Sequence, residues 1–206
     1  MGRAPRIDVG DVVYHVINRA NARARIFHDA TDYQDFEYLL SEMKETFDMR
    51  ILAYVIMPNH WHLLLHPMND GDMSKALHWL GTSHVRRHHT RKETIGNGHL
   101  YQGRYKSFLV QEDLHFLTVL KYIERNPVRA KLVSKAEDWK WGSAHRRING
   151  TERQRSLLAE LPVDLPRGYK QWINTAEPSE ELDAVRHSVN KGTSFGHVDL
   201  PINIRP

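Results

Sequence analysis

Two kinds of hydrophobic pattern alternate along the first 110 residues of the chain. Runs rich in Val, Ile, Leu and Tyr indicate strands, whereas apolar residues that recur every three or four positions indicate helices. In chain order the pattern predicts a strand over 12–17, a helix over 29–47, strands over 51–57 and 60–66, a helix over 73–89 and a strand over 104–110. Asp29 or Thr31 is a candidate N-cap of the first helix, and Pro58 and Asn59 form the turn between the middle strands.

The order strand, helix, strand, strand, helix, strand is that of the ferredoxin-like, split βαβ arrangement. It predicts an α+β fold with an antiparallel sheet and helices on one face. A third helix is expected from Asp113 to about Arg125, stopped by Pro127, and a short helix from Trp139, with its tryptophans docked on the core. Beyond about Gly150, Pro and Gly interrupt the pattern. We therefore expect one domain over 1–150 and a C-terminal extension of short helices and loops over 151–206.

Composition narrows the class of protein. The 206 residues include no cysteine, which excludes disulfides, cysteine zinc sites and thiol nucleophiles. No run approaches the roughly 18 apolar residues that span a bilayer, and no signal peptide is evident, so we expect a soluble intracellular protein with no membrane partner. Residues 1–155 carry 24 Lys and Arg against 18 Asp and Glu, a net charge of +6 within an overall +4. This excess suits a polyanion such as nucleic acid.

The first candidate for chemistry is the pair His60 and His62, in the predicted strand over 60–66. Side chains at i and i+2 of a strand point to the same face, so both imidazoles would aim at one point while Trp61 faces the other way. Two imidazoles on one face make half of a metal site. The alternative from the residues alone is one partly buried histidine with an exposed neighbour.

The second candidate is Tyr122 in the third predicted helix. The apolar stripe of that helix consists of Phe116, Leu120 and Ile123, and Tyr122 lies off it. Its helical neighbours are polar, namely His115, Thr118, Arg125 and Asn126. The alternative is an ordinary tyrosine hydroxyl that is hydrogen-bonded at the surface.

These motifs together resemble the HUH single-tyrosine (Y1) transposases of the IS200-like superfamily, and most of all the branch of REP-associated tyrosine transposases. The supporting segments are residues 14–21, 55–63, 101–105, 122–130, 141–143 and 188–196. The resemblance runs from about residue 5 to 147. One departure is Arg19-Ala20-Asn21, where members of the family commonly have Arg-Gly-Asn.

The resemblance implies a metal-dependent single-stranded DNA endonuclease and strand transferase that forms a 5′-phosphotyrosine intermediate. His60 and His62 match the paired metal-binding histidines, Tyr122 matches the nucleophile, and Asn126 matches the polar side chain that completes the metal site. Two imidazoles and an amide oxygen favour Mn²⁺ or Zn²⁺, whereas the family points to Mg²⁺ or Mn²⁺, which we rank first for catalysis.

The resemblance also implies a partner and a location. The expected partner is single-stranded DNA that contains a hairpin. A monomer is favoured over a dimer. The expected location is the cytoplasm of a prokaryote, in association with the nucleoid.

Basic residues near these motifs are candidate DNA contacts, against the alternative of an ordinary solvated surface. They are Arg19, Arg86, Arg87, Arg104, Lys106, Arg125 and Arg129. Tyr105 and Trp61 are candidates for stacking on bases, although Trp61 is equally compatible with the core. Tyr105 is also a rival nucleophile.

Two other functions fit the same scaffold. One is a nucleic-acid-binding protein in which the chemistry is unused. The other is a metal-dependent phosphoesterase that uses water as the nucleophile, which would have no need of Tyr122.

Overall fold

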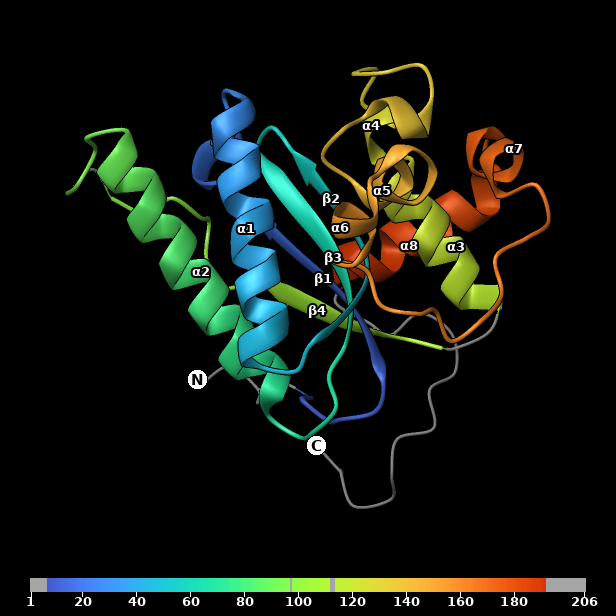
Figure 1. Ribbon diagram of the computed structural model, residues 1–206, viewed down its shortest axis with the longest axis horizontal. Coiled ribbons are helices and arrows are strands. Elements are labelled where there is room, and N and C mark those ends of the chain that lie inside the picture. Colours follow the sequence, from blue (N-terminus) through green and yellow to red (C-terminus); the bar gives the residue numbers. More distant parts are fainter. Residues whose placement is uncertain (1–6, 97, 112–113, 192–206) are drawn as a thin grey trace.

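Four strands form one antiparallel sheet in the order β2-β3-β1-β4 (Figure 1). The computed structural model describes residues 7–96, 98–111 and 114–191. The strands are β1 (Val13–Arg19), β2 (Arg50–Met57), β3 (His60–His66) and β4 (Lys106–Val110). The strand order confirms the ferredoxin-like prediction, and it places β3, with its two histidines, inside the sheet.

Helices α1 (Ala30–Thr46) and α2 (Asp72–Arg91) cover one face of the sheet (Figure 1). Asp29 caps α1, and its side chain and that of Asp32 form a reciprocal capping box with the backbone. The core on this face includes Trp61 and Leu63 of β3, packed against α1 residues such as Phe36. Helices α1 and α2 therefore occupy one face of the sheet, as predicted.

The opposite face is covered as well, which the expectation of helices on one face did not include. Helix α3 (Leu114–Glu124) packs there, with Phe116, Leu120 and Ile123 buried against the sheet. The reason lies in the strands, because β2 is buried on both of its faces and its apolar run is nearly continuous. Helix α4 (Asn126–Arg129) follows directly.

The remaining short helices lie on the same side as α3 (Figure 1). They are η2 (Ala136–Asp138), α5 (Ser143–Asn149), α6 (Glu152–Arg155), α7 (Tyr169–Asn174) and α8 (Ser179–Lys191), and a further 3-10 helix, η1 (Asn21–Arg23), follows β1. Short helices do follow residue 150, but the division into 1–150 and 151–206 stays a prediction. In the described part of the chain, no helix is long and apolar enough to cross a membrane.

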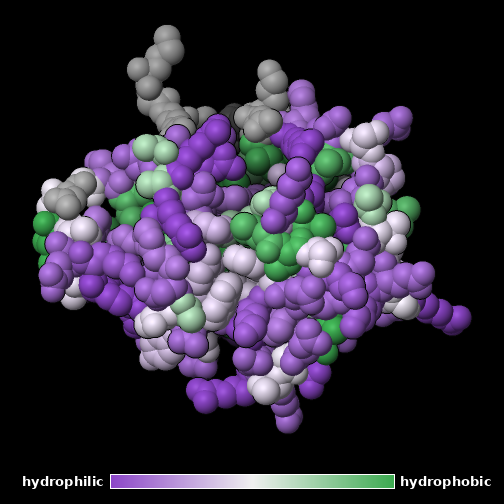
Figure 2. All heavy atoms as spheres, turned by 90° about the horizontal axis from the view of Figure 1, so that it is seen from above, coloured by the Kyte–Doolittle hydropathy of each residue, from purple (hydrophilic) through white to green (hydrophobic). Residues whose placement is uncertain are grey.

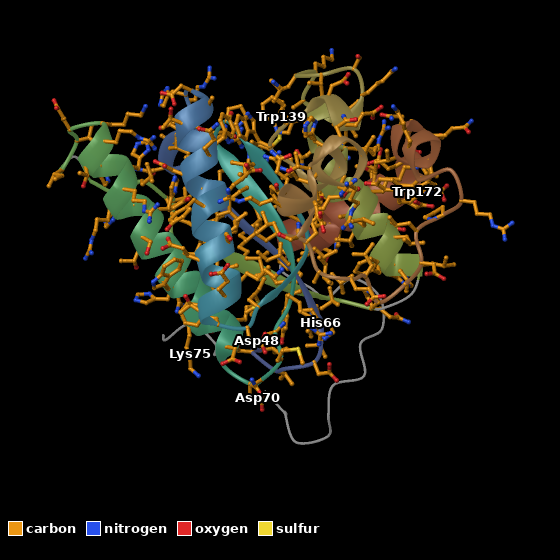
Figure 3. All side chains as sticks on the ribbon, in the orientation of Figure 1. Asp48, His66, Asp70, Lys75, Trp139 and Trp172 are labelled. Carbon is orange, nitrogen blue, oxygen red and sulfur yellow. The ribbon has the colours of Figure 1, made fainter. Side chains whose placement is uncertain are left out.

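The tryptophans after α4 dock on the core, as predicted. The indole of Trp139 donates a hydrogen bond to the Ile56 carbonyl at 3.0 Å, and Trp141 stacks on Tyr33 with 4.9 Å between ring centroids. Figure 3 shows Trp139 at the end of the sheet opposite to His66, while Trp172 lies on α7. The short helix α5 begins at Ser143, four residues later than expected.

The outer edge of β2 is occupied by backbone from the C-terminal half. The amide of Ile56 donates to the Trp141 carbonyl, and the amide of Ala159 donates to the Ile51 carbonyl, each at 2.8 Å. Between them, the amide of Tyr54 donates to Ser143 Oγ at 3.2 Å. The edge strand therefore has its exposed polar groups paired within the same chain.

Candidate active site

His60 and His62 lie on the same face of β3, at the end where the strand leaves the β2–β3 turn. Their ring centroids are 5.2 Å apart. His62 is 1% exposed and His60 is only partly exposed, whereas Trp61 points into the core on the other face. The alternation of a strand thus brings two imidazoles together near the surface.

The hydrogen bonds of His60 define which of its ring nitrogens carries a proton. Its Nδ1 lies 2.6 Å from Oδ1 of Asn59, an oxygen that can only accept. Nδ1 is therefore the donor, and in the neutral ring the lone pair is on Nε2. That nitrogen is the one left to act as a ligand.

Burial keeps both imidazoles neutral near pH 7. It lowers the pKa of His60 to about 4, with a further contribution from the positive charge of Arg19. Burial also lowers the pKa of His62 well below its usual value, and the nearby rings of His15 and His60 add to the effect. Neutral imidazole is the state in which a histidine binds a metal.

Tyr122 comes from α3 and Asn126 is the first residue of α4. The Tyr122 ring lies edge-on to His62 with 5.8 Å between centroids, and Nδ2 of Asn126 lies 3.2 Å from Nε2 of His62. The third and fourth helices therefore bring these two side chains to the histidine pair on β3. Both side chains reach His62 although α3 ends at Glu124, before Asn126.

The structure adds His15, which the sequence did not suggest as a site residue. It lies on β1, is 2% exposed, and its Nε2 is 2.8 Å from Nδ1 of His62. Burial lowers its pKa to about 3. The sequence did contain a sign of this role for His15. The histidine interrupts the apolar run Val13 to Ile17, two residues after the core residue Val13 and so on the same face of the strand.

The side chains around His60 and His62 offer a limited set of ligands for a divalent cation. Among the described residues, no group of three or more His, Asp or Glu side chains is placed to hold a metal ion. The candidate ligands are instead two neutral imidazoles and the Asn126 amide, whose oxygen would replace its nitrogen after a half-turn of the side chain. This set fits Mn²⁺ or Zn²⁺ on ligand type, and Mg²⁺ only if water and phosphate oxygens supply the rest.

Two of the candidate DNA contacts lie at the histidine end of the sheet, where Arg19 pairs with His60 and Lys106 pairs with Ile17. Arg86 on α2, Arg104 before β4 and Lys106 are exposed, whereas Arg19 is partly exposed. Figure 2 looks onto the molecule from the side of the β2–β3 turn and shows a mainly hydrophilic surface with separate hydrophobic areas. Arg87 is paired with Glu42 at 3.0 Å and lies over the Tyr38 ring.

The other two arginines are engaged inside the protein. Arg125 is buried, with Nε 2.6 Å from Glu177 and NH1 3.0 Å from the Ile173 carbonyl. In this arrangement Arg125 does not reach the surface, because the chain turns after α3 and directs it toward the C-terminal extension. A contact between Arg125 and DNA stays a prediction. Arg129 also pairs with Glu177 and donates to the Tyr122 carbonyl.

Neither aromatic candidate is placed to stack on a base. Trp61 is fully buried, and its indole donates to the Tyr101 hydroxyl at 2.8 Å. Tyr105 is 8% exposed, and its hydroxyl lies 3.3 Å from Ser74 Oγ. Both belong to the core on the face of α1 and α2, whereas the histidine pair is on the other face. Tyr105 is thus also poorly placed as a rival nucleophile.

Comparison with known proteins identifies the family. The family model described as "Transposase IS200 like" matches residues 8–126, more than half of the chain. The chain belongs to this family of IS200-like transposases. The match ends at Asn126 and includes every residue of the candidate site, from His15 to Asn126.

Two relatives belong to the same branch of the IS200-like transposases. A protein of Haemophilus influenzae, assigned as a REP-associated tyrosine transposase, is 27% identical over 127 residues, which cover 57% of this chain and 72% of that protein. The REP-associated tyrosine transposase of Escherichia coli K12 is 22% identical over 139 residues, which cover 68% and 79% of the two chains. The closeness to this branch that the motifs indicated is therefore confirmed.

A solved structure has the same fold. A REP-associated tyrosine transposase bound to a REP hairpin superposes with a TM-score of 0.59 at 19% identity, over 86% of this chain and 93% of that one. The likeness extends beyond residue 126. The shared architecture therefore includes at least part of the C-terminal extension.

The departure at Ala20 from the glycine of the family causes no strain. Ala20 has φ −60° and ψ 147°, an extended conformation open to any residue, and it is fully buried. The left-handed conformations of this loop fall two and three residues later, at Ala22 with φ 51° and Arg23 with φ 56°. The loop thus keeps its course without the glycine.

Proposed function

We propose that this protein cleaves and rejoins single-stranded DNA, with Tyr122 as the nucleophile and a divalent cation, Mg²⁺ or Mn²⁺, held by His60, His62 and Asn126. The observation that carries the proposal is the edge-on placement of the Tyr122 ring 5.8 Å from His62, within one chain. The Tyr122 ring thus lies against a buried histidine that also contacts Asn126, which supports a role beyond packing.

The reaction is a transesterification. The phenolic oxygen of Tyr122 forms a bond to a DNA phosphorus while the bond from that phosphorus to the 3′ oxygen breaks. The phenol gives up its proton, and the leaving oxygen takes one up as a 3′ hydroxyl. The DNA 5′ end stays on the protein as a phosphotyrosine diester, which a 3′ hydroxyl can attack in the reverse direction without ATP.

The two histidines and the amide have a defined task in this scheme. They would hold a cation, which when bound would polarise the phosphate and offset charge on the leaving oxygen. His60 and His62 are neutral near pH 7 and keep ring nitrogens available for it. Asn126 links the ligand set to the helix pair that carries the nucleophile, so the phenol and the ligands keep a fixed relation.

The proposed substrate is single-stranded DNA that contains a hairpin. The shared fold supports this, since the solved relative is bound to a REP hairpin. Basic residues that reach the surface supply phosphate contacts in this proposal, namely Arg19 and Lys106 at the histidine end of the sheet together with Arg86 and Arg104.

We further propose that the tyrosine acts within its own subunit, so that a monomer suffices. The end of α3 is held to α5 and α7 of the same chain by Glu124, which is buried. Its carboxylate accepts hydrogen bonds from Ser143 at 2.6 Å and from Tyr169 at 2.5 Å. Exchange of α3 between two subunits would require these buried contacts to break.

The test is capture of a covalent adduct. The protein is incubated with single-stranded oligonucleotides from the sequences that flank its gene, with Mn²⁺ or Mg²⁺, and adducts are resolved on a denaturing gel. We expect an adduct with the wild type, none with Tyr122→Phe, and an undiminished one with the matched variant Tyr105→Phe. His60→Ala should lose cleavage and metal affinity together.

Each result that contradicts this expectation would indicate a different function. An adduct that persists in Tyr122→Phe would refute the nucleophile. Tight DNA binding by the wild type without any adduct would favour the non-catalytic binder, and cleavage by Tyr122→Phe without an adduct would favour a phosphoesterase that uses water.

A further inference from the structure

We propose that His15 is a positioning residue that fixes the tautomer of His62, so that the lone pair of His62 is on Nε2, the nitrogen that faces Asn126. The inference extends the proposed function, because it concerns the same metal site, but its first test needs no metal. It rests on the contacts of three side chains from three different elements: β1, β3 and α4.

The contact between the two histidines is direct and sheltered from water. Nε2 of His15 lies 2.8 Å from Nδ1 of His62, and the rings stack at an interplanar angle of 21°. His15 is 2% exposed and His62 is 1% exposed. A neutral imidazole has one N–H and one lone pair, so in this bond one ring donates and the other accepts.

The contact with Asn126 reveals the direction of that bond. Its amide nitrogen Nδ2 lies 3.2 Å from Nε2 of His62 and can only donate. Nε2 of His62 is therefore the acceptor, which puts the proton of this ring on Nδ1. His62 then donates through Nδ1 to Nε2 of His15, and His15 carries its own proton on Nδ1.

The surroundings of His15 hold it in this orientation. On β1, His15 pairs with Leu64 of β3 and Phe108 of β4. The ring of Phe108 is edge-on at 5.9 Å and that of Tyr122 is edge-on at 6.0 Å. A leucine or phenylalanine would fill such a position without a polar group, so the presence of an imidazole indicates a specific hydrogen-bonding task.

The consequence for metal binding follows from the choice of nitrogen. A ring with its proton on Nε2 would present an N–H, not a lone pair, toward Asn126 and could not act as a ligand there. Hydrogen bonds to the second nitrogen of a ligand histidine typically change metal affinity 10- to 100-fold. His15 therefore prepares the site before any cation binds.

The experiment compares His15→Leu, which removes the acceptor, with His15→Gln, whose Oε1 can accept near the position of Nε2. The matched control is His84→Leu, since His84 is equally buried but lies on the other face, where it bonds to Tyr101. Ring ¹⁵N shifts of His62 are measured in the metal-free proteins, and Mn²⁺ affinity is measured by calorimetry.

We expect the wild type and His15→Gln to show His62 protonated on Nδ1. His15→Leu should show a mixture of tautomers and bind Mn²⁺ at least 10-fold more weakly. His15→Gln should stay within about 3-fold of the wild type, and His84→Leu should leave both measurements unchanged.

Several results would overturn the proposal. One is a wild-type His62 protonated on Nε2, which can be read even if His15→Leu does not fold. Another is a His15→Leu protein with unchanged tautomer and affinity, or a His15→Gln protein as impaired as His15→Leu. If the wild type binds no Mn²⁺ at all, the proposed function fails, while the ¹⁵N shifts still decide the role of His15.

Discussion

The guanidinium of Arg129 lies 4.3 Å from the centre of the Tyr122 ring and also donates a hydrogen bond to the Tyr122 backbone carbonyl. Glu177, between α7 and α8, pairs with Arg129 and, at 2.6 Å, with Arg125. Its side chain is only 5% exposed. A carboxylate of the C-terminal extension thus holds the arginine that packs on the proposed nucleophile.

Glu177→Gln should therefore slow DNA cleavage and destabilise the protein. Removal of the carboxylate leaves two buried guanidinium groups without their counter-charge, a change that costs about 3 kcal/mol. For a chain of this length, that corresponds to a fall in Tm of roughly 6–12 °C. Single-turnover cleavage and thermal unfolding are the two measurements.

A double-mutant cycle separates the effect on Tyr122 from the loss of stability. If Glu177 acts through Arg129, then Glu177→Gln adds little to the slower cleavage already seen in Arg129→Gln. Glu181→Gln, an exposed carboxylate at the start of α8, is the matched control and should change neither quantity. Additive losses in cleavage would contradict the link through Arg129.

The free energy of unfolding should depend steeply on pH between about 4 and 6.5. Burial lowers the pKa of His15 and of His84 to about 3, and that of His60 to about 4, from an ordinary value of 6.5. In this pH range the unfolded chain binds protons that the folded protein does not, so the free energy of unfolding rises with pH and reaches its full value above pH 6.5. Each of these histidines adds about 1.4 kcal/mol per pH unit to the slope of the free energy of unfolding.

Urea unfolding at pH 4.5, 5.5 and 7.5 checks this slope. His84→Phe removes one buried histidine away from the candidate site and should make the dependence shallower by about one proton. A free energy of unfolding that stays constant between pH 5 and 7 would show that these rings are protonated in the folded protein.

Arg104 and Arg125 should respond differently when each is replaced by Gln. Arg104 is exposed, so Arg104→Gln should weaken binding of single-stranded DNA and lower the salt dependence of log K by about 0.7, the value for one phosphate contact. Arg125→Gln should lower Tm and leave the salt slope unchanged, because Arg125 is buried against Glu177.

Fluorescence anisotropy over a range of salt concentrations measures the slope. Arg153→Gln, an exposed arginine on α6, controls for loss of charge alone. If Arg125→Gln reduces the dependence of log K for DNA binding on salt concentration, the ion pair between Arg125 and Glu177 must open when DNA binds.

Local patterns were sufficient to predict much of the molecule. Period-two alternation predicted that His60 and His62 share a face, and the order of elements predicted the sheet. A spacing of four residues placed Tyr122 and Asn126 on one side of a helix, and both do contact His62, although the helix ends between them. Each of these relations depends on residues close together in sequence, where the geometry of one strand or helix decides the outcome.

The relations that were missed join distant parts of the chain. His15 meets His62 across 47 positions, and Arg125 meets Glu177 across 52. Helical spacing placed Arg125 beside Tyr122, but the chain turns between α3 and α4 and carries its guanidinium toward Ile173. Sequence periodicity does not specify which loop will supply a buried partner.

The paired outer edge of β2 ties the sheet to the extension. Ala159, whose amide bonds to the Ile51 carbonyl, lies beyond residue 150. A polypeptide ending at residue 150 would keep the contacts from Trp141 and Ser143 but would uncover the Ile51 end of this apolar edge, where a strand of a neighbouring molecule could pair. The last quarter of the chain thus protects one end of the sheet against self-association, and a shortened version of this scaffold has to retain it.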